Sequence, residues 1–206
     1  MRGLALFVAV LLAAATVSAA TLVLQPGYEG KDSHLTTNRP SSNYGTYSLL
    51  TVAYVPTMAN RGIVEFDLSP CTGATINSAY LELYNDNPNA TYEYCGIYRV
   101  LAAWVEMSVT WNNQPAHRAT AYTKTMIGGK GVWKFDVKTL VSEWAAGTYA
   151  NYGFILKKDN ETRGLYPMFC SSDHVNSTWR PKITVDYAED FAVVPDSVGR
   201  VKALFR

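Results

Sequence analysis

A hydroxyl, a carboxylate and an imidazole stand within four consecutive residues at Ser171-Ser172-Asp173-His174. These are the groups of a nucleophilic triad, but a triad needs them to converge in space, which adjacency along the chain does not provide. The nucleophile elbow Gly-x-Ser-x-Gly is also missing from the sequence. Nucleophilic catalysis is therefore not expected.

Paired carboxylates are the second kind of chemistry to consider. Glycoside hydrolysis needs two acids about 5–10 Å apart across a cleft, and Glu82, Glu93, Glu106 and Glu143 qualify only by type. A polysaccharide lyase would need a Tyr or His base, which 14 tyrosines cannot single out. We expect no enzyme activity, and a hydrolase or lyase stays the weaker alternative.

Aromatic side chains suit sugar binding better. The apolar face of a sugar ring stacks on an exposed aromatic ring, while short polar side chains bond its hydroxyls. Strand alternation places Tyr80 and Tyr84 outside the core, and Tyr44, Tyr47 and Tyr54 are further candidates. The alternative is that such tyrosines only decorate a β-sheet.

No cofactor is predicted, although one turn could hold a structural Ca²⁺. Asn85, Asp86 and Asn87 carry the oxygen ligands that Ca²⁺ prefers, and a plain Asx-rich turn is the alternative. The three cysteines permit one disulfide and a free thiol, or no disulfide. Their spacing and that of the histidines give no zinc signature.

Composition limits the class of protein. The 206 residues carry 18 basic and 17 acidic side chains, which argues against a nucleic-acid partner. An apolar fraction of 48% with 13% aromatic residues is enough for one globular domain.

The two ends of the chain differ from the middle. Residues 1–19 have the basic start, apolar run and small residues of a secretory signal peptide, with cleavage after Ala19 or Ala20. A membrane anchor would need about 20 apolar residues, more than this run provides. Residues 20–187 form the predicted domain of a secreted, extracellular protein. The tail, residues 188–206, could form a short helix that folds back or docks a partner.

Period-two alternation of apolar and polar residues predicts short strands across the domain, separated by turns rich in Asn, Gly, Pro and Ser. The strands are expected at 63–68, 79–84, 133–137, 152–157, 165–170 and 183–187. One helix is expected over 138–146, because Leu140, Val141 and Trp144 share a face and Gly147 can end it. The predicted fold is all-β, an antiparallel β-sandwich of jelly-roll type with one short helix.

Five ordered sequence blocks resemble the DNRLRE domain family, which is also carbohydrate-binding module family 96 and is related to archaeal disaggregatases. Residues 61–69 resemble R-x-L-L-x-F-D-L-S, and residues 74–83 resemble A-x-I-x-S-A-x-L-x-L. Residues 104–115 resemble W-x-E-x-x-V-T-W-N-N-x-P, and residues 136–147 resemble D-V-T-x-x-V-x-x-W-x-x-G. Residues 169–187 resemble F-x-S-S-E followed by R-P-x-L-x-V-x-Y. The resemblance implies a β-sandwich that binds polysaccharide without cleaving it.

The resemblance also suggests ligand-binding residues. Family members that bind acidic polysaccharides such as alginate are thought to use basic side chains and a tyrosine. Together with Tyr44, one of the tyrosines named above for sugar stacking, the candidates are Lys31, Arg39, Tyr44, Arg61 and Tyr166. A bridging role inside the fold is the alternative for Arg61. A structural or adhesive surface module is the alternative for the whole chain.

Overall fold

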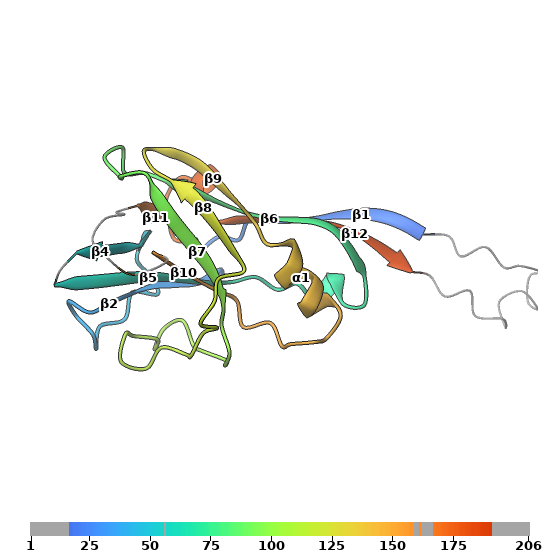
Figure 1. The fold of residues 1–206 in the computed structure, drawn as a ribbon, viewed down its shortest axis with the longest axis horizontal. Coiled ribbons are helices and arrows are strands. Elements are labelled where there is room, and N and C mark those ends of the chain that lie inside the picture. The colour runs from blue at the N-terminus through green and yellow to red at the C-terminus, as the bar shows by residue number, and fades with distance from the viewer. Residues whose placement is uncertain (1–16, 56, 159–160, 162–166, 191–206) are drawn as a thin grey trace, which may run out of the picture.

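The computed structural model describes residues 17–190 except 56, 159–160 and 162–166 (Figure 1). The described part is a sandwich of two antiparallel β-sheets, which confirms the predicted all-β class. The jelly-roll connectivity stays a prediction. The first residues of the predicted tail, 188–190, instead belong to the last strand, β12 (Lys182–Asp190), and the rest of the tail, 191–206, lies outside the described residues.

The first sheet is centred on a long strand, β6 (Thr75–Asn85). Strand β6 pairs with three neighbours and thereby joins both arms of the sheet. The order is β1 (Val17–Leu24), β12 (Lys182–Asp190), β6, β11 (Met168–Cys170) and β3 (Leu49–Thr51), with β9 (Gly131–Asp136) also paired to β6.

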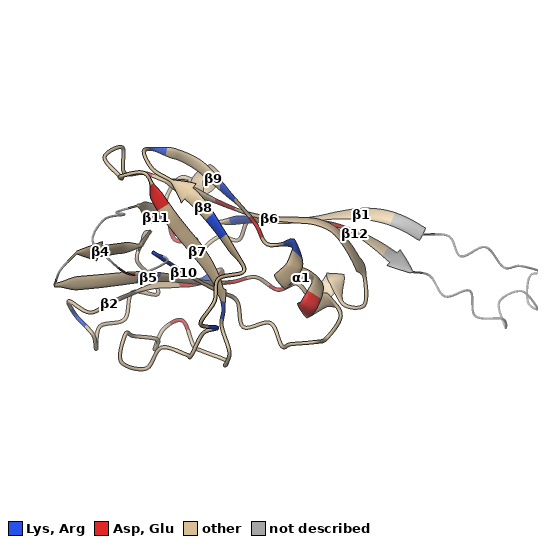
Figure 2. Cartoon of the chain, viewed as in Figure 1, with Lys and Arg blue, Asp and Glu red and all other residues tan. Residues whose placement is uncertain are grey.

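The second sheet is centred on β5 and β10. Its order is β2 (Lys31–Thr36), β5 (Met58–Glu65), β10 (Phe154–Lys158), β7 (Glu93–Arg99) and β8 (Thr123–Ile127), with β4 (Ala53–Val55) also paired to β5. Charged residues of both signs are dispersed along the strands (Figure 2), as the near-zero net charge leads one to expect.

The main core lies between the sheets and confirms the alternation in the sequence. The inward positions of β6, Ala79, Leu81 and Leu83, are fully buried. The predicted strand at 63–68 ends earlier, at Glu65, and is followed by a 3-10 turn, η1 (Ser69–Cys71). Phe66 nevertheless stays buried beyond the strand end.

A second, smaller core lies on the outer face of the second sheet. The long connection at residues 100–122 covers this face, and Trp104 is its central side chain, 7% exposed. The indole N–H of Trp104 donates to the carbonyl of Tyr152 at 3.0 Å. The side chains that form this second core are Leu35, Ile63, Tyr98, Val100, Trp104, Val109 and Ile155. The outer face of this sheet is therefore a packed interior rather than a free surface.

Helix α1 (Lys138–Ala145) agrees with the prediction. Leu140, Val141 and Trp144 are buried on one side of it. Gly147 follows with φ +69, and its N–H donates to the carbonyl of Trp144, so a left-handed glycine ends the helix as expected. No helix in the described part of the chain has the length and apolarity needed to cross a membrane.

Two open points of the sequence concern the cysteines and the chain ends. Cys71, Cys95 and Cys170 are all buried free thiols, so the alternative without a disulfide describes this fold. Strand β1 begins at Val17, so the predicted cleavage point falls inside a strand, and cleavage stays a prediction.

Candidate functional site

The predicted ligand-binding residues do not form one group. Lys31 and Arg61 project from the same face of the second sheet, because Lys31 pairs with Glu65 and Arg61 stands four residues before Glu65 on β5. That spacing separates them by about 13 Å along the strand. Arg39 is exposed in the turn after β2, and Tyr44 lies in the following loop. Tyr166 lies outside the described residues.

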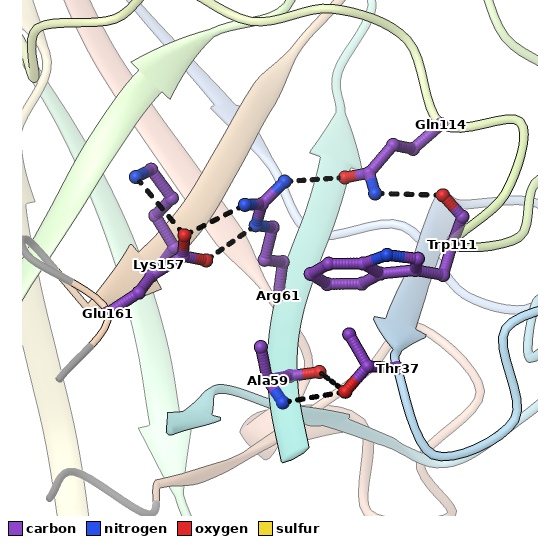
Figure 3. Close-up of polar contacts among 7 residues, drawn as sticks. All are labelled: Thr37, Ala59, Arg61, Trp111, Gln114, Lys157 and Glu161. Atoms are coloured by element: carbon purple, nitrogen blue, oxygen red, sulfur yellow. Dashed lines mark hydrogen bonds and ion pairs between the residues drawn. The ribbon is translucent and has the colours of Figure 1, made fainter. Parts of the chain in front are cut away.

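Arg61 has internal partners on three sides (Figure 3). Its Nε and Nη2 donate to the two carboxylate oxygens of Glu161 at 2.7 and 2.9 Å, and its Nη1 donates to Gln114 Oε1 at 2.9 Å. The guanidinium carbon lies 4.6 Å from the centre of the Trp111 ring. With its side chain only 14% exposed, Arg61 has the bridging geometry that the sequence left open as an alternative.

The charges around Arg61 form a cluster of two cations, Arg61 and Lys157, on one carboxylate, Glu161. Lys157 Nζ lies 3.9 Å from Glu161 Oε2. Burial alone would raise the pKa of Glu161, but the hydrogen bonds and charge of Arg61 hold that pKa below its usual value. Burial, together with the cations Arg61 and Lys157, lowers the pKa of His117 to about 4. Glu161 is thus ionised and His117 neutral at physiological pH.

Lys31 is the predicted residue that reaches a cavity. Its ammonium pairs with Glu65 Oε2 at 2.8 Å and lies 4.6 Å from the centre of the Trp104 ring. About a third of its side chain, 32%, is exposed. That exposed part lines a groove at one end of the sandwich.

This end groove has a volume of about 830 Å³ and lies where β1, β2, β5 and the segment after α1 meet. Such a volume is within the range of about 300–1,000 Å³ that is usual for ligand sites. Its walls combine aromatic, amide and charged side chains, among them Gln25, Glu29, Lys31, Glu65, Asp67, Trp144, Tyr149 and Asn151.

Tyr149 is the exposed aromatic residue of the end groove. It is 39% exposed, and the guanidinium of Arg99 lies 3.5 Å from its ring centre. This cation–π contact braces one face of the ring. Sequence reasoning missed Tyr149 because it lies in a loop, where alternation gives no orientation. Its place just after the Gly147 helix end was the one available signal.

The end groove is acidic. Glu65 pairs with Lys31, while Glu29 and Asp67 accept backbone N–H bonds from Gly27 and Ser69. Those backbone hydrogen bonds lower the pKa of Glu29 and of Asp67, so both are ionised at neutral pH. Three carboxylates therefore face one ammonium, which disfavours a polyanion.

Tyr44 belongs to an aromatic group in the loop that follows β2. Its ring stacks on His34 with the ring centres 4.1 Å apart, and Tyr47 meets both rings edge-on. Burial lowers the pKa of His34. Tyr47, which is 48% exposed, is the most exposed of the three residues. Tyr44 therefore supports the ring of Tyr47, which was only a further candidate from the sequence.

The outer face of the first sheet carries a second aromatic pair. Tyr80 and Tyr84 point outward as alternation predicts, and Tyr84 stacks on Trp179 with ring centres 4.3 Å apart and nearly parallel planes. Lys130 lies 5.1 Å from the centre of the Trp179 ring. Trp179, in η2 (Ser177–Trp179), was missed because it lies outside any alternating run.

The Ser171–His174 stretch does not form a triad. Ser171 Oγ donates to the carbonyl of Tyr47 at 2.8 Å. His174 Nδ1 accepts the N–H of Asn176 at 3.1 Å. Ser171 thus ties its turn to the loop at Tyr47 and His174 holds its own turn, which explains their presence without catalysis.

The Asn85–Asn87 turn matches the plain Asx alternative. Asn85 Oδ1 accepts the N–H groups of Asn87 and Met168 at 3.1 and 2.9 Å, and Asp86 pairs with Lys130 at 2.7 Å. The amide oxygen of Asn85 and one carboxylate oxygen of Asp86 are thus used within the fold.

Comparison with known proteins supports the resemblance. A family model described as carbohydrate-binding module family 96 matches residues 28–186. No curated protein matches the sequence.

Proposed function

The chain belongs to carbohydrate-binding module family 96, and from this membership we propose that it is an extracellular, non-catalytic module that binds a polysaccharide in the end groove. The observation that carries the proposal is Tyr149, a braced and partly exposed ring inside a groove of about 830 Å³. The predicted signal peptide supports the extracellular location.

The end groove offers what sugar recognition requires. An aromatic ring such as that of Tyr149 stacks on the apolar face of a pyranose, and the ring needs little reordering because Arg99 already holds it. Lys31 supplies a hydrogen-bond donor, and Glu29 and Asp67 supply acceptors for sugar hydroxyls, whereas the amide nitrogen of Gln25 already donates to the carbonyls of Thr178 and Arg180. A short stretch of polysaccharide would therefore make both stacking and polar contacts here.

The charge of the end groove favours a neutral polysaccharide. Three carboxylates against one ammonium would repel the carboxylates of an alginate or pectin chain. Arg61, one of the cationic candidates from the sequence, is occupied by Glu161 and Gln114. This proposal therefore departs from the acidic polysaccharide that the family resemblance suggested.

Affinity electrophoresis or calorimetry on cellulose, chitin, alginate and pectin tests the proposal. We expect retention on a neutral polymer, and we expect Tyr149→Ala to weaken binding at least about tenfold, because a central aromatic residue carries much of the binding energy at such a site. Tyr94→Ala, which removes a similarly exposed ring (49%) outside the groove, is the matched control.

Two results would contradict the proposal in different ways. If Trp179→Ala abolished binding while Tyr149→Ala did not, the site would lie on the first sheet beside Tyr84. If the folded protein bound no polymer at all, a structural or adhesive surface role would replace the binding function.

A further inference from the structure

Three acidic residues from distant parts of the chain meet at the free edge of β2. Asp32 comes from β2, Glu106 from the connection that covers the second sheet, and Asp173 from the turn after β11. One carboxylate oxygen of each lies within 4.8 Å of those of the others. Like charges at this distance repel one another, so the arrangement needs a compensating partner.

The fold fixes this acidic cluster in place. The N–H of Asp32 donates to Glu106 Oε1 at 2.9 Å, and the N–H of Ser172 donates to Asp32 Oδ2 at 2.8 Å. The carbonyl of Glu106 accepts a hydrogen bond from Asn43 Nδ2 at 2.6 Å. The carboxylates of Asp32 and Glu106 therefore cannot separate without breaking these bonds.

The observation that points to a ligand is the unsatisfied oxygen of Asp32. Asp32 is 1% exposed, and its Oδ1 makes no hydrogen bond within the described part of the chain. The buried hydroxyl of Ser172 interacts with Asp32, whose pKa it lowers, and has no other partner in the described part of the chain. A buried carboxylate oxygen without a donor is costly, and such an atom calls for an explanation.

Nearby cations supply only part of the missing charge: Lys31 lowers the pKa of Glu106 and Arg180 that of Asp173, in each case by less than burial raises it. Lys31 pairs with Glu65 at 2.8 Å, and Arg180 donates to the carbonyl of His174 at 2.9 Å. Burial raises the pKa of all three acids, that of Asp32 to about 7, and the charge of Asp173 adds to the rise at Asp32 and Glu106. A divalent cation would relieve both effects.

We propose that Asp32, Glu106 and Asp173 bind a calcium ion. The donors are all oxygens, which suits a hard cation and not zinc. Calcium accepts six to eight oxygens in irregular geometry, whereas magnesium requires a near-ideal octahedron. The three donors come from segments that no shared strand pairing joins, so the ion would link the covering connection, the β2 edge and the turn after β11.

Metal binding to the EDTA-stripped chain at pH 7.5 tests this proposal without any glycan. We expect Tb³⁺ luminescence excited through tryptophan, displaced by Ca²⁺, and a rise of several degrees in the melting temperature when Ca²⁺ is well above its Kd. Extracellular calcium modules have a Kd of about 10⁻⁴–10⁻³ M, and we expect that range or tighter.

Variants connect the binding to the acidic cluster. Asp173→Asn, at the half-exposed member, should weaken Ca²⁺ binding at least about tenfold and still fold. Asp32→Asn should abolish the Ca²⁺-dependent rise in melting temperature. Asp136→Asn removes an exposed acid outside both the cluster and the end groove and should bind Ca²⁺ as the unaltered chain does.

The proposal fails if the folded, unaltered chain shows no Tb³⁺ signal and the same melting temperature with Ca²⁺ as with EDTA. It also fails if Asp32→Asn is more stable than the unaltered chain with Ca²⁺ present, because the cluster would then be an uncompensated repulsion. Equal stabilisation by Mg²⁺ at the same concentration would overturn the choice of calcium. Loss of glycan binding alone would not bear on the site.

Discussion

Replacing Arg61 with methionine removes the guanidinium but keeps a side chain that can pack on Trp111. The change eliminates two hydrogen bonds to Glu161 and one to Gln114. Breaking a buried ion pair costs about 3–5 kcal/mol. Glu161 is 24% exposed and keeps Lys157 nearby, so part of its charge is rehydrated or compensated. We therefore expect Arg61→Met to lower the free energy of unfolding by about 3 kcal/mol, at the lower end of that range.

Urea unfolding followed by tryptophan fluorescence measures this loss. Arg61→Lys keeps the charge but loses the bidentate hydrogen bonds to Glu161, and should lower the free energy of unfolding by about 2 kcal/mol. A double-mutant cycle with Glu161→Gln isolates the pair, for which we expect a coupling of about 2 kcal/mol. Lys130→Met, which breaks the exposed pair with Asp86, should leave stability near that of the unaltered protein.

The acid side of the stability profile gives an independent check. Because Arg61 holds the pKa of folded Glu161 below its unfolded value, the pair's contribution is present above the unfolded pKa. It disappears as the pH falls through the folded pKa. Arg61→Met should therefore lose less stability than the unaltered protein between neutral and acid pH. A coupling energy near zero together with unchanged acid sensitivity would refute the bridging role of Arg61.

Two further predictions concern buried titratable groups. The pKa of folded His117, about 4, lies below its unfolded value, so the unfolded chain binds a proton first as the pH falls from about 6.5 to 4. The free energy of unfolding should therefore fall by about 1–2 kcal/mol over that interval, after a discount for the partial exposure of the ring. In urea titrations at pH 7 and 4.5, the free energy of unfolding of His117→Gln should fall correspondingly less. Burial raises the pKa of the Cys71, Cys95 and Cys170 thiols, so none should react with a thiol reagent in the folded protein and all three should react in urea; rapid labelling without denaturant would contradict this burial.

The central strand of the first sheet was predictable because only one of its faces is buried. In β6 the alternation of Ala79, Leu81 and Leu83 with polar neighbours reports the core directly. The second core was not predictable in the same way, because Trp104 and Val109 lie in a connection without regular period. Only the tertiary fold brings that connection over Ile63 and Ile155.

The candidate site shows the same limit. Lys31 was a candidate from the sequence, and it does line the end groove. Tyr149 could not be predicted there, because it reaches the groove only through the packing of the segment after α1 against β1 and β5. The acidic cluster unites positions 32, 106 and 173, whose separation along the chain gives no ligand spacing to recognise. Arg61 was ambiguous because its donors suit both a sugar carboxylate and Glu161.

The pairing of β1 with β12 has a mechanical consequence. The register runs from Leu24 opposite Ile183 to Val17 opposite Asp190, and the two strands extend together from the body of the sandwich (Figure 1). A pulling force applied between residues 17 and 190 would load the ladder one rung at a time, as in opening a zipper. In the uncleaved chain, β1 would therefore peel from β12 under a small tension, while β12 stays anchored by its own pairing with β6 and the inter-sheet core is spared.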